Sequence, residues 1–154
     1  MSDATTTAAS RAVDELNHLL RGELAAVETY DQSLPKFEEF PAAAQELRRI
    51  RDEHRETCRV LREHVTKFGG APSDTSGPWG GFAQAVTGTA KLLGPDTTLA
   101  ALKRGEEHGI NDYQDALDKE PLPAECKDLI RTRLLPRCQE HLANLDSIRS
   151  FIGS

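Results

Sequence analysis

The sequence predicts an all-α protein, a four-helix bundle with a long crossover between its second and third helices. Four segments place apolar residues at intervals of three and four, which is the spacing of one helix face. Residues that favour strands form no alternating runs. One stretch also occurs twice, as RGELAAVETYDQSL at residues 21–34 and as RGEEHGINDYQDAL at residues 104–117. The chain therefore has the pattern of two related helical hairpins.

The first predicted helix runs from about Ser10, which is suited to cap a helix N-terminus, to Leu34. Pro35 ends it, because proline cannot continue a helical hydrogen-bond ladder. Glu23 lies within the apolar stripe of this helix. Residues 1–9 have neither the basic nor the apolar region of a secretory signal, and we expect them to form a disordered leader.

The second predicted helix opens near Pro41 and ends at Gly69 and Gly70, with His54 at the centre of its stripe. Residues 70–94 follow, and they are too many for a simple turn between neighbouring helices. They are long enough to travel the length of a bundle. Their second half predicts a short amphipathic helix, and we expect Trp79 and Phe82 to cover one face of the bundle.

The third predicted helix begins at residues 95–97 and runs to about Lys119, with Glu106 on its apolar stripe. The fourth follows Pro123 and runs to about Ile152, with His141 on its stripe. Pro136 falls inside the fourth helix, and we expect a kink there. Residues 10–153 then form a single domain of ordinary size.

Composition excludes several classes of function. The formal net charge is −6 and no basic stripe is present, so the sequence argues against nucleic-acid binding. No apolar run approaches the ~20 residues that a membrane helix needs. The cysteines are Cys58, Cys126 and Cys138, an odd number that is typical of reduced thiols in a cytoplasmic protein. A homo-oligomer stays open, and no residue is predicted to be catalytic.

One polar residue stands in the middle of the apolar face of each predicted helix: Glu23, His54, Glu106 and His141. A glutamate on such a face is costly unless it is paired or bound to metal. Two carboxylates and two imidazoles form a ligand set of the kind found in di-iron and di-manganese bundles. The pattern predicts a metal site for iron or another divalent metal, with one or two ions. Such a site is suited to react with dioxygen or peroxide and to cycle between Fe(II) and Fe(III).

The helix order and the Glu–His–Glu–His sequence of inward residues resemble the ferritin-like superfamily. The segments FGGAPSDTSGPWGGF and RGEEHGINDYQDALDKEPLPAECKDLI resemble small bacterial ferritin-like proteins that have no assigned activity. The resemblance implies two further glutamates, each three residues before a histidine, where this chain has Arg51 and Cys138. Glu53 and Glu140 lie about 100° round the helix from the neighbouring histidine, and we expect neither to substitute.

Two other hypotheses stay open. In the first, the glutamates and histidines neutralise one another as a metal-free polar layer, in a bundle with a structural or stress-associated role, and Arg51 joins as a counter-charge. In the second, Cys58 and Cys138 form a redox pair, which requires a depressed thiol pKa. Tyr30 and Tyr113 share the stripes with the glutamates, where a tyrosine most often packs as core. Donation of hydrogen bonds to the site, or a relay of electrons, is the alternative role for them.

Overall fold

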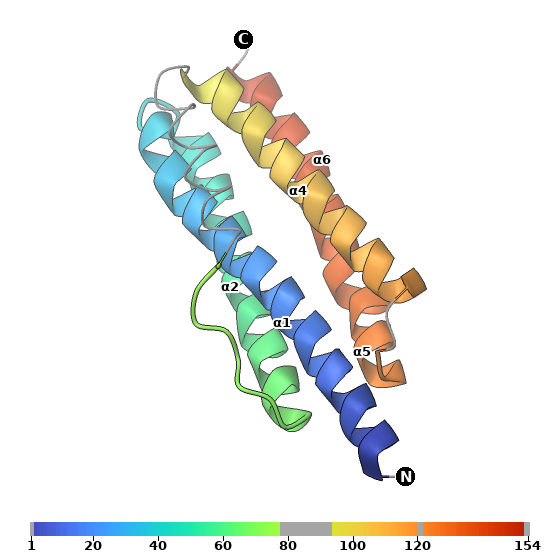
Figure 1. The fold of residues 1–154 in the computed structure, drawn as a ribbon. Helices are drawn as coiled ribbons and strands as arrows, with labels where there is room; N and C mark the ends of the chain where they lie inside the picture. The colour runs from blue at the N-terminus through green and yellow to red at the C-terminus, as the bar shows by residue number, and fades with distance from the viewer. Residues whose placement is uncertain (1, 78–93, 120–121, 153–154) are drawn as a thin grey trace.

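The computed structural model describes residues 2–77, 94–119 and 122–152, and these ranges contain no strand. Four helical stretches lie side by side (Figure 1). In chain order they are α1 (Ser2–Ser33), α2 (Pro41–Lys67), α4 (Gly94–Lys119) and a stretch made of α5 (Ala124–Leu129), η2 (Ile130–Leu134) and α6 (Leu135–Ile152). Helix α1 packs on α2, α4 packs on α6, and the two pairs contact each other. The predicted all-α four-helix bundle is confirmed.

Helix α1 begins at Ser2, well before the predicted cap at Ser10. Residues 2–9 are part of this helix and contain neither proline nor glycine to interrupt it, and the leader at residues 1–9 stays a prediction. At its other end α1 passes into the short 3₁₀ helix η1 (Leu34–Phe37), with Pro35 in its first turn. Pro35 has no N–H group and therefore cannot extend the α-helical ladder.

Helix α2 ends where the sequence predicts. Gly69 adopts a φ of +86°, and the Gly70 N–H donates to the Val65 carbonyl at 2.9 Å. This is a Schellman ending, which needs a left-handed residue and so favours glycine. The chain then turns back along α1, where Asn17 binds the backbone of Ala71 and Ser73. The predicted short helix of the crossover, with Trp79 and Phe82, lies outside the described residues.

The fourth helical stretch is not uniformly α-helical. Residues 130–134 form the π-helical turn η2, and the Leu135 N–H donates to the Ile130 carbonyl. Pro136 follows directly and has no N–H to donate within a regular α-helix. The structure therefore has a widened turn before Pro136, at the place where the sequence predicts a kink.

The core consists of two apolar clusters separated by a polar layer. One cluster includes the buried leucines Leu16, Leu20, Leu61 and Leu134. The other includes Leu47, Leu99, Leu145 and Ile148. Each of α1, α2, α4 and α6 contributes one segment to each cluster. Between its two segments, each helix carries one buried Glu or His. Within the described ranges, no helix is both long and apolar enough to cross a bilayer.

Candidate metal centre

The four residues predicted for the site all lie in the polar layer, one from each of α1, α2, α4 and α6. Their exposed fractions are 6% for Glu23, 4% for His54, 4% for Glu106 and 0% for His141. The imidazole of His54 lies between the two glutamates. Its Nδ1 is 2.5 Å from Glu23 Oε2, and its Nε2 is 2.7 Å from Glu106 Oε1. The repeated glutamates therefore meet across one histidine ring rather than face each other directly.

Each glutamate also accepts a hydrogen bond from a tyrosine of the other repeat. The Tyr30 hydroxyl donates to Glu106 Oε1 at 2.7 Å, and the Tyr113 hydroxyl donates to Glu23 Oε1 at 2.5 Å. Burial and the adjacent carboxylates raise the pKa of both tyrosines well above the ordinary value. Both hydroxyls therefore stay protonated and act as donors. The sequence favoured a core role and left hydrogen bonds to the site as the alternative; in the structure both tyrosines are buried and make those hydrogen bonds.

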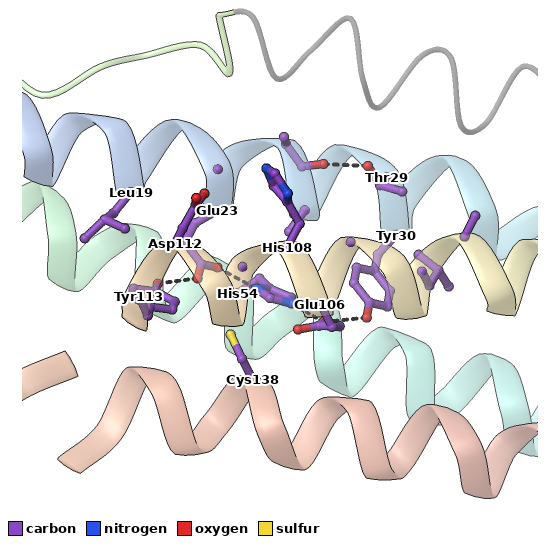
Figure 2. A pocket seen from close by; sticks show the side chains of 17 residues that line it. Leu19, Glu23, Thr29, Tyr30, His54, Glu106, His108, Asp112, Tyr113 and Cys138 are labelled. Carbon is purple, nitrogen blue, oxygen red and sulfur yellow. Dashed lines mark hydrogen bonds and ion pairs between the residues drawn. The ribbon is translucent and has the colours of Figure 1, made fainter. Parts of the chain in front are cut away.

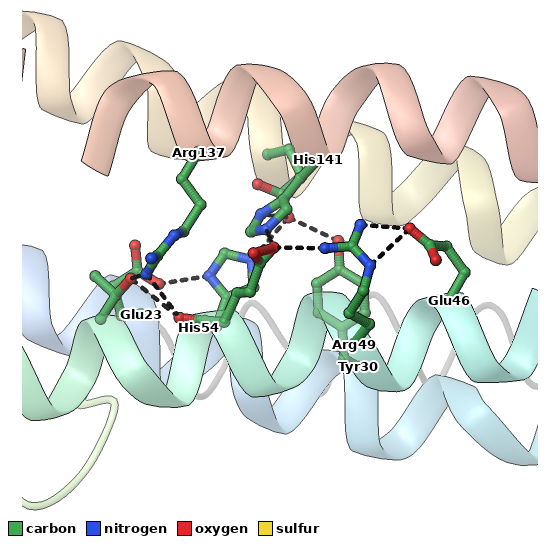
Figure 3. Close-up of polar contacts among 10 residues, drawn as sticks. Glu23, Tyr30, Glu46, Arg49, His54, Arg137 and His141 are labelled. Carbon is green, nitrogen blue, oxygen red and sulfur yellow. Dashed lines mark hydrogen bonds and ion pairs between the residues drawn. The ribbon is translucent and has the colours of Figure 1, made fainter. Parts of the chain in front are cut away.

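His141 has different surroundings (Figure 3). Its Nε2 is 2.9 Å from Glu53 Oε1, a carboxylate on α2. Its Nδ1 is 3.4 Å from Glu106 Oε1, which is within ion-pair range but without the geometry of a hydrogen bond. Among the described residues, this nitrogen is the buried side-chain polar atom that has no hydrogen-bond partner. The His54 and His141 rings are 4.7 Å apart between centroids.

Glu53 makes a contact that the sequence does not predict. Its position on α2 is turned away from His54, as predicted, but its carboxylate reaches His141 on the neighbouring α6. Its side chain is 28% exposed, and Arg49 donates to it at 3.0 Å. The Arg137 guanidinium lies nearby and donates to Thr57 Oγ1 at 3.1 Å. The spacing of Arg49 and Glu53 predicts their ion pair, but no periodicity within one helix reveals a contact with another helix.

The charged groups of the polar layer stabilise one another in their charged forms. Burial alone would lower the pKa of His54, but the negative charges of Glu106 and Glu23 raise it well above its ordinary value. Burial likewise opposes ionisation of Glu106, yet the neighbouring His54 and His141 hold the pKa of Glu106 well below its usual range. The contacts of His54 are therefore those of an imidazolium between two carboxylates.

Three of the four residues form a buried group that could hold a metal ion. One ligand atom each from His54, Glu106 and His141 lies within 4.8 Å of the others, and all three residues are buried. Glu23 is outside this group, because it contacts the far nitrogen of His54. In metal sites, a carboxylate in that position commonly orients the histidine and fixes its tautomer.

A family model matches residues 11–119, which is most of the chain. Its description is "Domain of unknown function (DUF2383)". This chain belongs to the DUF2383 family. The matched region of the DUF2383 protein contains Glu23, His54 and Glu106 and ends before α5, η2 and α6, so His141 lies outside it. The chain has no significant match among curated proteins or among solved structures.

Arg51 of this DUF2383 protein does not enter the polar layer. Its guanidinium pairs with Asp31 at 2.9 Å and with Asp52 at 3.1 Å, both exposed carboxylates. The expectation that Arg51 joins the layer as a counter-charge is therefore wrong. These exposed acids hold the long side chain at the edge of the bundle. Arg51 thus places no cation among the candidate ligands.

The cysteines do not have the properties that the thiol hypothesis requires. Burial raises the pKa of Cys58 to about 12 and that of Cys138 well above its ordinary value. All three cysteines of the DUF2383 protein are buried and free. A reactive thiol needs a depressed pKa, so the prediction of a redox pair is wrong in its chemical premise. Cys138 fills the position of an expected ligand with a small apolar side chain.

Proposed function

We propose that this DUF2383 protein is a metal-binding protein of the ferritin-like type, with His54, Glu106 and His141 as ligands and iron as the metal. The observation that carries the proposal is the buried Nδ1 of His141, which has no hydrogen-bond partner in the part of the chain that the structure describes and lies 3.4 Å from Glu106 Oε1. A buried nitrogen without a partner costs about 1–3 kcal/mol. A cation bound between the three residues would remove that cost.

The distances around Glu106 suit one ion. Its Oε1 is 2.7 Å from His54 Nε2 and 3.4 Å from His141 Nδ1. Bonds of ~2.1 Å that meet at 90–110° separate ligand atoms by roughly 3.0–3.4 Å. Small movements therefore open the space that a cation needs. An ion that binds His54 Nε2 must first displace the proton there, so binding should weaken at acidic pH.

Both histidines also have the support that metal-binding imidazoles usually have. Glu23 accepts from Nδ1 of His54, which leaves Nε2 directed at Glu106. Glu53 contacts Nε2 of His141, which leaves Nδ1 directed at the same carboxylate. A carboxylate on the outer nitrogen orients the ring and makes the inner nitrogen a better ligand. These contacts favour Glu23 as a supporting residue, although its carboxylate remains a candidate ligand if the layer rearranges.

Iron is the first candidate because two histidines and one carboxylate with open positions are typical of non-haem Fe(II) sites. A bound Fe(II) ion would supply one-electron redox chemistry. Because the His54 ring separates Glu23 from Glu106, the contacts favour one ion over a dinuclear pair that shares both carboxylates. A role in oxidation or stress handling is the one that the ferritin-like resemblance suggests.

Metal analysis tests this proposal directly. Protein produced with iron supplied should contain about one equivalent of metal per chain, and chelation should lower its melting temperature. Glu106→Gln should abolish binding, because it replaces the shared carboxylate. Glu107→Gln, at the exposed next position, is the matched control and should bind as the wild type does. The proposal fails if no metal is found and chelation leaves the melting temperature unchanged.

A second candidate is the metal-free polar layer in a structural or stress-associated bundle. The observation in its favour is that both nitrogens of His54 already have carboxylate partners. On this hypothesis His141→Leu should leave stability unchanged or raise it, because an apolar side chain removes a desolvation cost. A large loss of stability that appears with metal supplied and is absent from chelated protein would contradict the metal-free hypothesis.

A further inference from the structure

A cavity of about 70 Å³ lies between α1 and α4, beside the polar layer (Figure 2). Its walls come mainly from small and apolar residues: Leu19, Ala25, Ala26, Ala101 and Leu102. The exposed His108 and the half-buried Asp112 line it as well, so it reaches toward solvent between the two helices. Glu106 and His54 line its inner end, so the cavity adjoins the proposed metal site.

Two repeat-equivalent glycines, Gly22 on α1 and Gly105 on α4, line the cavity from opposite helices. Glycine inside a helix destabilises it relative to alanine. Neither glycine has a positive φ, so the backbone does not require one. A Cβ atom added at either position would meet no atom within 4 Å, so close packing does not require one either. What both glycines do is leave the space between the helices open.

Several polar side chains that line the cavity already have hydrogen-bond partners. The Tyr30 hydroxyl is bonded to Glu106, and both nitrogens of His54 are engaged with carboxylates. The Tyr113 hydroxyl is bonded to Glu23, and the Thr29 hydroxyl is bonded to the Ala25 carbonyl of its own helix. A polar guest would have to break these bonds, whereas an apolar guest would contact methyl groups and ring carbons.

We propose that this cavity is a binding pocket for a small, uncharged, apolar molecule of a few heavy atoms, held open by Gly22 and Gly105. The volume sets the size class. An apolar cavity of ~150 Å³ takes up benzene or xenon, and the present one has about half that volume. The pocket ends at the buried layer, so a bound molecule would lie against the side chains of Tyr30 and His54.

Xenon is a suitable probe because it is apolar, uncharged and small enough for the space. Chelated, metal-free protein would be titrated with xenon while the backbone amide NMR shifts are recorded. The wild type should show saturable shifts at residues of α1 and α4 around the cavity. Gly22→Leu and Gly105→Leu should each weaken xenon binding at least tenfold. Gln114→Leu, on the exposed side of α4, is the matched control and should bind as the wild type does.

Gly22→Ala covers the case in which the leucine variants do not fold. It should raise the melting temperature, because alanine is the better helix former, and it should weaken xenon binding by a smaller factor. The proposal is overturned if the wild type shows no saturable shift, or if the folded glycine variants bind xenon as the wild type does. The xenon titration uses protein from which metal has been removed. A failure of the proposed metal binding therefore leaves this test unaffected.

Discussion

His54 and His141 occupy equivalent places in the two repeats, but their surroundings differ. His54 lies between two buried carboxylates and has a partner at each nitrogen. His141 has the partly exposed Glu53 at one nitrogen and no hydrogen bond at the other. The glutamates and tyrosines, by contrast, keep the symmetry of the repeat, since each tyrosine binds the glutamate of the other copy. The two repeats thus share one polar layer, and among the side chains described in that layer His141 Nδ1 is the buried nitrogen without a hydrogen bond.

The largest expected effect comes from removing His54, in contrast with His141, in metal-free protein. His54→Leu leaves two buried carboxylates without their cation and should cost about 3–5 kcal/mol of unfolding free energy. His141→Leu should change it by less than about 1 kcal/mol, because Glu53 can turn to solvent. Urea denaturation of the chelated proteins measures both. Equal losses would mean that the two histidines are equivalent after all.

The tyrosines should instead give matched effects. Tyr30→Phe and Tyr113→Phe each remove a hydrogen bond to a buried charged group, and each should cost about 1.5–3 kcal/mol. The same denaturation measurement applies, and both values should agree within about 1 kcal/mol. A clear loss in only one variant would show that the repeat symmetry does not extend to the strength of these bonds.

Glu53 and Glu140 test whether the asymmetry affects metal binding. Each directly precedes a histidine, but in the structure Glu53 contacts His141 whereas Glu140 is exposed. Glu53→Gln should weaken metal affinity about 10–100-fold, as is usual when a residue that supports a ligand is changed. Competition with a chelating dye would measure the affinity. Glu140→Gln is the matched control, and equal affinities for the two variants would argue against a role for Glu53.

The smallest effect is expected at the cysteine thiols, which take no part in the contrast between His54 and His141. Burial raises the pKa of Cys58 to about 12 and that of Cys126 to about 11, so both stay protonated in the folded protein at pH 8. Native protein should therefore react slowly with iodoacetamide, and urea should expose three reactive thiols. Because folding disfavours the thiolates, stability should fall as pH rises above the ordinary thiol pKa. Fast alkylation of native Cys58 at pH 8 would contradict this.

Helical periodicity was enough to predict the four helices and to place Glu23, His54, Glu106 and His141 inward. The contacts of Glu53 and Arg51 could not be predicted in the same way, because they depend on how neighbouring helices are rotated against each other. Arg51 is only three residues before His54, but its guanidinium pairs with Asp31 on α1 and so lies outside the polar layer. The iron, the cytoplasmic location and a homo-oligomer stay predictions.

The π-helical turn at residues 130–134 fixes the rotational phase of the helix that follows it. Cys126, Ile130, Leu134 and Cys138 are all buried at intervals of four. In a regular α-helix each such step drifts by ~40°, so a fourth inward residue would have turned well out of the core. The wider turn absorbs that drift. The π-helical turn therefore sets the direction in which His141 points. Deleting one residue from this turn would rotate the imidazole by ~100° about the helix axis, whereas most substitutions in the turn would not rotate it.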